Sequence, residues 1–118
     1  MKIPAIKENN ALSSTEQAVG VDVDGKVIYE KTCYADNVNW SSDQYISSYP
    51  KPSDISRLIS IEGATKLSEG DWIVAPYLVT IGSNIYQSAF AISSDGVRLS
   101  IQNLTVTAYH AIVRYTKN

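Results

Sequence analysis

The sequence predicts an all-β protein that folds as an antiparallel β-sandwich, jelly-roll-like or Ig-like, with about seven to eight short strands. Three observations support this fold class. Short β-branched segments alternate in polarity with a period of two, which is typical of strands that bury one face. Turn signals rich in Gly, Asp and Asn separate these segments at regular spacing. One of these signals, Asp24-Gly25, lies between two β-branched runs and is a strong hairpin signal.

Length and composition limit the class of protein. The 118 residues suit one domain, which we expect at 18–118 after a polar leader or connector at 1–17. Hydrophobic residues make up 44% of the chain, which favours a folded core over disorder. The formal charge is −2 and the 10 basic residues form no dense cluster, so nucleic acid is not an expected partner. No stretch approaches the roughly 18–20 apolar residues of a membrane span, so we expect no membrane insertion.

The segment 18–32 is predicted to form the first hairpin. Val19, Val21 and Val23 share one parity, so we expect them on the buried face of its first strand. The Asp24-Gly25 pair predicts a type I′ turn, in which both central residues have positive φ. The other alternating segments predict strands at 55–61 (ending at Glu62-Gly63), 84–92, 97–102 and 108–115, with a polar connection at 64–70.

The segment 71–81 is the most apolar of the chain. Both parities are apolar, which favours a strand covered on both faces by its own sandwich and by a neighbouring subunit. Pro76 cannot donate a ladder hydrogen bond. The segment is therefore predicted as an edge strand, a bulge, or two strands with a break at the proline.

The segment 33–52 is irregular, and Pro50 and Pro52 exclude a central strand there. Long loops in small domains are often functional. Aromatic rings can cover the apolar faces of sugars while Asn and Asp bind the hydroxyl groups. Alternatively, the aromatic side chains pin the loop to the sandwich. A binding site requires at least two of the aromatic rings exposed together. The candidate ligand-binding residues are Tyr34, Asn39, Trp40, Asp43, Tyr45 and Tyr49.

Catalytic patterns are weak. His110 is the only histidine, and Cys33, the only cysteine, would need such a partner to act as a nucleophile. A lone cysteine beside a strand is more often a small buried hydrophobic residue. A glycan hydrolase would need two converging carboxylates, such as Asp36 with Asp43. No phosphate loop or metal-ligand spacing occurs, so we expect a non-enzymatic protein with no cofactor and no metal.

Two segments carry a resemblance to a known family. They are Ser14-Thr15-Glu16-Gln17-Ala18-Val19-Gly20 with Asp24-Gly25-Lys26 and Ile28-Tyr29-Glu30-Lys31-Thr32, and Ala108-Tyr109-His110-Ala111-Ile112-Val113-Arg114-Tyr115-Thr116-Lys117. Together they resemble the ends of the C-terminal β-domain of tail-fibre and baseplate (receptor-binding) proteins of bacteriophages and prophages of Gram-positive bacteria.

The resemblance implies a virion structural protein, made in the bacterial host cytoplasm and located in the virion tail. It also implies a homotrimer that contacts other tail or baseplate proteins and a bacterial surface glycan or protein. Two alternatives stay open. One is a tail-associated polysaccharide hydrolase, and the other is a pure trimerisation or connector module without receptor contact.

Overall fold

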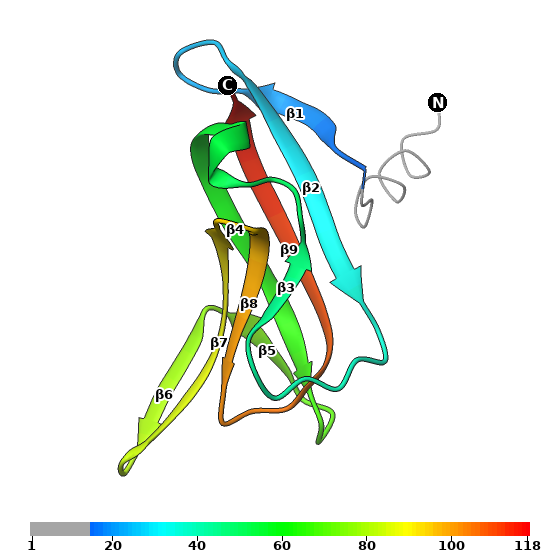
Figure 1. The fold of residues 1–118 in the computed structure, drawn as a ribbon, viewed down its shortest axis with the longest axis vertical. Helices are drawn as coiled ribbons and strands as arrows, with labels where there is room; N and C mark the ends of the chain where they lie inside the picture. The colour runs from blue at the N-terminus through cyan, green and yellow to red at the C-terminus, as the bar shows by residue number, and fades with distance from the viewer. Residues whose placement is uncertain (1–14) are drawn as a thin grey trace.

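The computed structural model describes residues 15–118, which form nine strands and one 3-10 turn, η1 (Pro52–Asp54). The strands build two antiparallel sheets, so the predicted all-β sandwich is confirmed, with nine strands in place of about seven to eight (Figure 1). In order across the first sheet, the strands are β1 (Gln17–Val21), β2 (Val27–Ala35), β9 (Val106–Lys117), β4 (Ile55–Leu67) and β5 (Trp72–Ala75). The second sheet has the order β3 (Gln44–Ser47), β8 (Gly96–Gln102), β7 (Asn84–Ser93) and β6 (Tyr77–Ile81).

The core lies between the inner faces of the two sheets. Val97 and Leu99 of β8 are fully buried, as their alternation predicts. On β9, Tyr109, Val113 and Tyr115 face them, and all three belong to the same buried cluster. The predicted strands at 84–92, 97–102 and 108–115 are therefore confirmed, each within two residues of its observed bounds at either end.

The first hairpin is confirmed, but the prediction of a type I′ turn in it is wrong. Only Gly25 in the turn has a positive φ, of 80°, so the turn is not type I′. The Asp22 N–H donates to the Lys26 carbonyl over 2.8 Å, which encloses a three-residue loop. The Asp22 carboxylate accepts hydrogen bonds from the Asp24 and Lys26 N–H groups at 2.8 and 2.9 Å. These side-chain bonds stabilise the longer loop in place of the two-residue turn.

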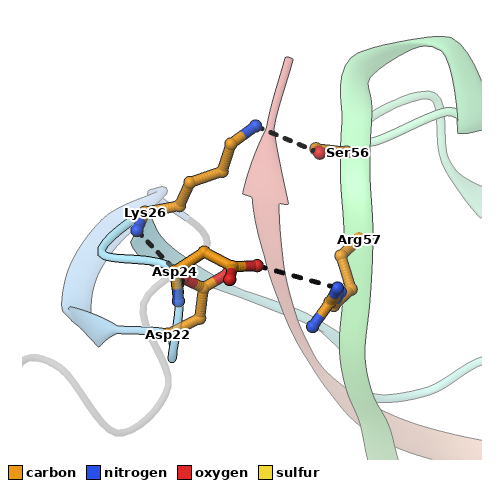
Figure 2. Close-up of polar contacts among 5 residues, drawn as sticks. All are labelled: Asp22, Asp24, Lys26, Ser56 and Arg57. Carbon is orange, nitrogen blue, oxygen red and sulfur yellow. Dashed lines mark hydrogen bonds and ion pairs between the residues drawn. The ribbon is translucent and has the colours of Figure 1, made fainter.

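The same turn docks on the start of β4, beside the end of β9 (Figure 2). Lys26 Nζ donates to Ser56 Oγ over 3.1 Å, and Arg57 lies 3.8 Å from the Asp24 carboxylate. Both contacts are solvent-exposed, so they orient the hairpin more than they stabilise it.

The valines of the first strand are exposed, against the prediction of a buried face. Val19 and Val21 lie on β1, and Val23 lies in the turn itself. Strand β1 is the edge strand of the first sheet and contributes no residue to the core cluster, so the second sheet does not cover its valines. The predicted leader falls mostly outside the described residues. Gln17 already belongs to β1, one residue before the predicted domain start.

Strand β4 is longer than predicted. It continues past Gly63 to Leu67, so most of the expected connection at 64–70 is strand. The reason is tertiary, because β4 has a partner on each side: Thr65 pairs with Tyr109 of β9 and with Ile73 of β5. Thr65 and Leu67 are buried, which a loop prediction from local polarity misses.

The apolar segment 71–81 is broken at Pro76, as one of the three alternatives for it predicts. Strand β5 ends at Ala75 in the first sheet, and β6 begins at Tyr77 in the second. The chain's own sandwich covers only one face of the segment, and cover of the other face by a neighbouring subunit stays a prediction. Leu78 is 67% exposed and Ile81 is 64% exposed in the single chain. Trp72, Val74 and Leu78 lie on the sheet face turned away from the core, in alternation with more buried residues of their strands.

Candidate functional site

Trp40 is a structural anchor in this fold. Its ring stacks on Tyr109 with centroids 5.4 Å apart and packs against the core. Its backbone forms an isolated bridge to Val106, with N–H to carbonyl distances of 2.9 and 2.8 Å. Both the ring and the backbone of Trp40 therefore hold the loop against β9.

Tyr49 is also turned toward the protein. Its ring meets Tyr115 edge-on at 6.1 Å, and its hydroxyl donates to Glu16 over 2.9 Å. The Lys31 ammonium lies 5.3 Å from the ring centroid and donates to the Tyr49 carbonyl over 3.2 Å. The polar end of Tyr49 is thus satisfied within the chain.

Asp43 and Tyr45 lie on the outer face of the second sheet, around Arg98. The Arg98 guanidinium donates to the Asp43 carboxylate and lies 6.0 Å from the Tyr45 ring centroid. The Ile101 N–H also donates to Asp43, over 2.8 Å. The Ile101 hydrogen bond and then the Arg98 guanidinium hold the pKa of Asp43 below its usual value. Arg98 is the one member of this group that the sequence does not single out.

The six predicted residues therefore do not converge on one surface. Tyr34 is 50% exposed and Tyr45 is 51% exposed, but they belong to different sheets. Tyr34 follows the buried Cys33 and so points out from the first sheet, while Tyr45 pairs with the outward-facing Arg98 of the second. Asn39 is exposed in the loop before Trp40. Among Trp40, Tyr45 and Tyr49, only Tyr45 is displayed.

A different groove, on the outer face of the first sheet, combines an exposed aromatic ring with polar side chains. We call it the Trp72 groove. Its volume is about 460 Å³, and the residues that line it are Asp36, Asn37, Val38, Lys66, Trp72, Thr107 and Ala108. Four segments thus meet at one site: the loop after β2, the end of β4, the start of β5 and the start of β9.

The register of the first sheet explains how the aromatic rings gather beside this groove. Tyr34 of β2 pairs with His110 of β9, and His110 pairs with Ala64 of β4, so the three share the outer face. Trp72 lies on the same face of β5, opposite Lys66. The Trp72 and His110 ring centroids are 6.1 Å apart. The small Ala64 side chain between their strands leaves room for this approach.

Sequence reasoning misses Trp72 as a surface residue because its strand is apolar on both parities. A signal was available in Pro76, which predicts an edge or a break. A strand of a two-layer sandwich also turns one of its two faces away from the core, and Trp72 and Val74 share a parity and therefore a face.

Cys33 and His110, the candidate nucleophile and base, are not brought together by the fold. Cys33 is buried, and burial raises the pKa of its thiol. Its side chain points inward while that of His110 points outward, so the two cannot form a nucleophile–base pair. Among residues 15–118, no group of three or more His, Cys, Asp or Glu side chains could hold a metal ion.

Comparison with known proteins gives no family for this chain. No family model matches it, and neither the curated proteins nor the solved structures include a significant match. Across residues 15–118, no helix has the length and apolarity needed to cross a bilayer.

Proposed function

We propose that this chain is a non-enzymatic structural module of a phage or prophage tail fibre or baseplate. In this proposal it self-associates as a homotrimer, binds other tail proteins, and contacts a bacterial surface glycan or protein. Its place would be the virion tail after synthesis in the bacterial host cytoplasm.

The spatial arrangement of the two resembling segments supports the proposal. The first contributes β1 and most of β2, and the second lies within β9. Strands β2 and β9 pair directly, with Tyr29 opposite Tyr115 and Glu30 opposite Arg114. The Arg114 guanidinium donates to the Glu30 carboxylate over 2.7 Å. Segments far apart in the sequence thus form one half of the same sheet, as parts of one domain would.

The observation that carries the proposal is the exposed apolar surface at the β6–β7 hairpin. Strand β7 pairs with β8 only from Gln87 onward, so residues 84–86 pair with β6 alone. The hairpin projects from the molecule (Figure 1). Leu78, Ile81 and Ile85 are all exposed on this arm. The register places Leu78 and Ile85 on one face of the arm and Ile81 on the other, so both faces carry exposed apolar side chains. Exposed apolar side chains on a protruding arm are typical of surfaces that a partner covers, and further copies of the chain would cover them in a fibre.

A connector without receptor contact is a second candidate, and one observation favours it. Trp40 and Tyr49 pack inward, as a purely structural module requires of the three aromatic residues Trp40, Tyr45 and Tyr49, while Tyr45 is exposed. Receptor contact in the proposal therefore depends on a surface other than this loop.

Light scattering behind size exclusion tests the self-association. We expect a mass near three times 12.9 kDa. Ile81→Lys should lower this mass, because a charge on the arm cannot be buried without a partner. Val23→Lys is the matched control, since Val23 is 92% exposed in the turn of the other hairpin. A monomeric wild-type protein, or equal effects of the two substitutions, would contradict the proposal.

A further inference from the structure

We infer that the Trp72 groove is the receptor contact of this module and binds a neutral pyranose sugar. The inference deepens the proposed function and rests on it for the biological setting. The site itself is argued from the groove's own residues.

The apolar part of the groove is the Trp72 ring. Trp72 is 52% exposed at the start of β5, although an indole buries a large apolar area when it is covered. The His110 ring, 6.1 Å away, packs beside it from β9. This contact supports one side of the indole and leaves the rest of its exposed surface available to a ligand.

The polar part consists of side chains with unused hydrogen-bonding capacity. Within residues 15–118, the Lys66 ammonium and the Asp36 carboxylate have no ion-pair or hydrogen-bond partner, and the Asn37 amide has none either. Thr107 differs, because its hydroxyl donates to the Lys66 carbonyl over 3.3 Å. The groove therefore offers one cationic donor, one anionic acceptor and one amide that can do both.

These groups match a pyranose more closely than a charged ligand. A pyranose has an apolar C–H face, which an indole covers, and hydroxyl groups at its edge that both donate and accept. Lys66 and Asp36 cancel in formal charge, so neither a phosphate nor an ammonium group is favoured as a whole. The volume of about 460 Å³ lies within the range of small-ligand sites.

Saturation-transfer NMR tests the inference with the methyl glycosides of glucose, galactose, rhamnose and N-acetylglucosamine. We expect signal transfer to ring C–H protons of at least one glycoside, with a Kd of about 1 mM. Trp72→Ala should weaken this binding about tenfold or more, because aromatic contacts of this kind contribute on that scale. Trp72→Phe should retain part of it. Asp36→Ala, in an exposed loop, should weaken it without any change in the sheet.

Tyr45→Ala is the matched control, since Tyr45 is equally exposed on the other sheet. Proton chemical-shift dispersion confirms that each variant is folded. Transfer to none of the four glycosides, or transfer that Trp72→Ala leaves unchanged, would overturn the inference. So would a drop in the solution mass of Trp72→Ala, because Trp72 would then belong to a subunit interface.

The mass of the same samples separates the two proposals. If the protein is a trimer and binds no glycoside, the sugar-binding inference is contradicted and the proposed structural module is supported. If the protein is a monomer and binds a glycoside through Trp72, the proposed self-association is contradicted and the sugar-binding inference is supported.

Discussion

The hydroxyl oxygens of Thr65 and Ser88 lie 2.9 Å apart, and both residues are fully buried. Thr65 belongs to β4 of the first sheet and Ser88 to β7 of the second, so the hydrogen bond crosses the interior of the sandwich. Each hydroxyl satisfies the other where neither meets water. This polar contact specifies how β7 packs over β4 between the two sheets.

Thr65→Val should lower the free energy of unfolding by about 1–3 kcal/mol, because it leaves the buried Ser88 hydroxyl without its partner. Adding Ser88→Ala removes the orphaned hydroxyl, so the double variant should be more stable than the sum of the two single effects predicts. Urea unfolding of the four proteins measures the coupling. Strictly additive losses would show that the hydrogen bond contributes nothing to the packing of the two sheets.

Glu16 connects the start of the described chain to the end of β9. Its carboxylate accepts hydrogen bonds from the Tyr49 and Tyr115 hydroxyls and pairs with Lys117. Burial acts to raise the pKa of Glu16, but the hydrogen bonds from Lys117, Tyr115 and Tyr49 outweigh it and lower the pKa below 4.5. Glu16→Gln should therefore cost about 1–3 kcal/mol at neutral pH, the usual contribution of hydrogen bonds to a charged group.

The lowered pKa of Glu16 also determines whether the protein gains or loses stability as the pH falls. The contribution of Glu16 is fully present above the unfolded-state pKa, near 4.5, and is lost as the pH falls through the lower folded-state value. Thermal unfolding between pH 7 and pH 3 should show a steeper loss of stability in the wild type than in Glu16→Gln. Glu69→Gln, at an exposed position, is the control and should follow the wild type. Parallel curves for all three proteins would contradict the role of Glu16.

Gly63 lies where β4 passes closest to the backbone of β9. A Cβ atom at Gly63 would come within 1.9 Å of the His110 carbonyl oxygen and 2.9 Å of the Ala111 Cα. Both are backbone atoms in the middle of the sheet, so they cannot move aside easily. Gly63→Ala should cost about 1–3 kcal/mol, as overpacking in a core does.

Gly20→Ala provides the comparison for Gly63, because a Cβ atom at Gly20 meets nothing within 4 Å. The substitution should change the free energy of unfolding by less than about 0.5 kcal/mol. Denaturant titrations of both variants measure the difference. A Gly63→Ala protein as stable as Gly20→Ala would mean that β4 and β9 can separate at this point without cost.

Cys33 is predicted to be unreactive in the folded protein. It is 6% exposed, and burial raises the pKa of its thiol, so little thiolate is available at neutral pH. Labelling with a chromogenic disulfide should be slow for the native protein and complete within the mixing time in denaturant. Fast labelling of the native protein would contradict the inward position of Cys33 and would restore it as a candidate nucleophile.

Local pattern alone is sufficient to predict the all-β class and most of the strands, and it includes the break at Pro76 among three alternatives for that segment. The clearest case is β8, where Val97 and Leu99 alternate with Arg98 and Ser100 and are fully buried. Such a strand lies in the interior of its sheet, so its own alternation reports the burial correctly. The aromatic loop illustrates the limit, because the same sequence is compatible with a binding surface and with the anchors that Trp40 and Tyr49 form.

Only the tertiary structure decides which faces are open. Val21 and Trp72 have the apolar pattern of buried strand residues, yet both are exposed because they lie outside the packed layer between the two sheets. Lys66 lies in a segment that the sequence predicts as a connection but that forms a strand. The reason is that β5 and β9 pair with this segment on both sides. The Trp72 groove joins three parts of the chain that are distant in sequence, 36–38, 66–72 and 107–108, and its geometry follows from the strand register between them. Register is a non-local property, set by which strands become neighbours, and no window of the sequence contains it.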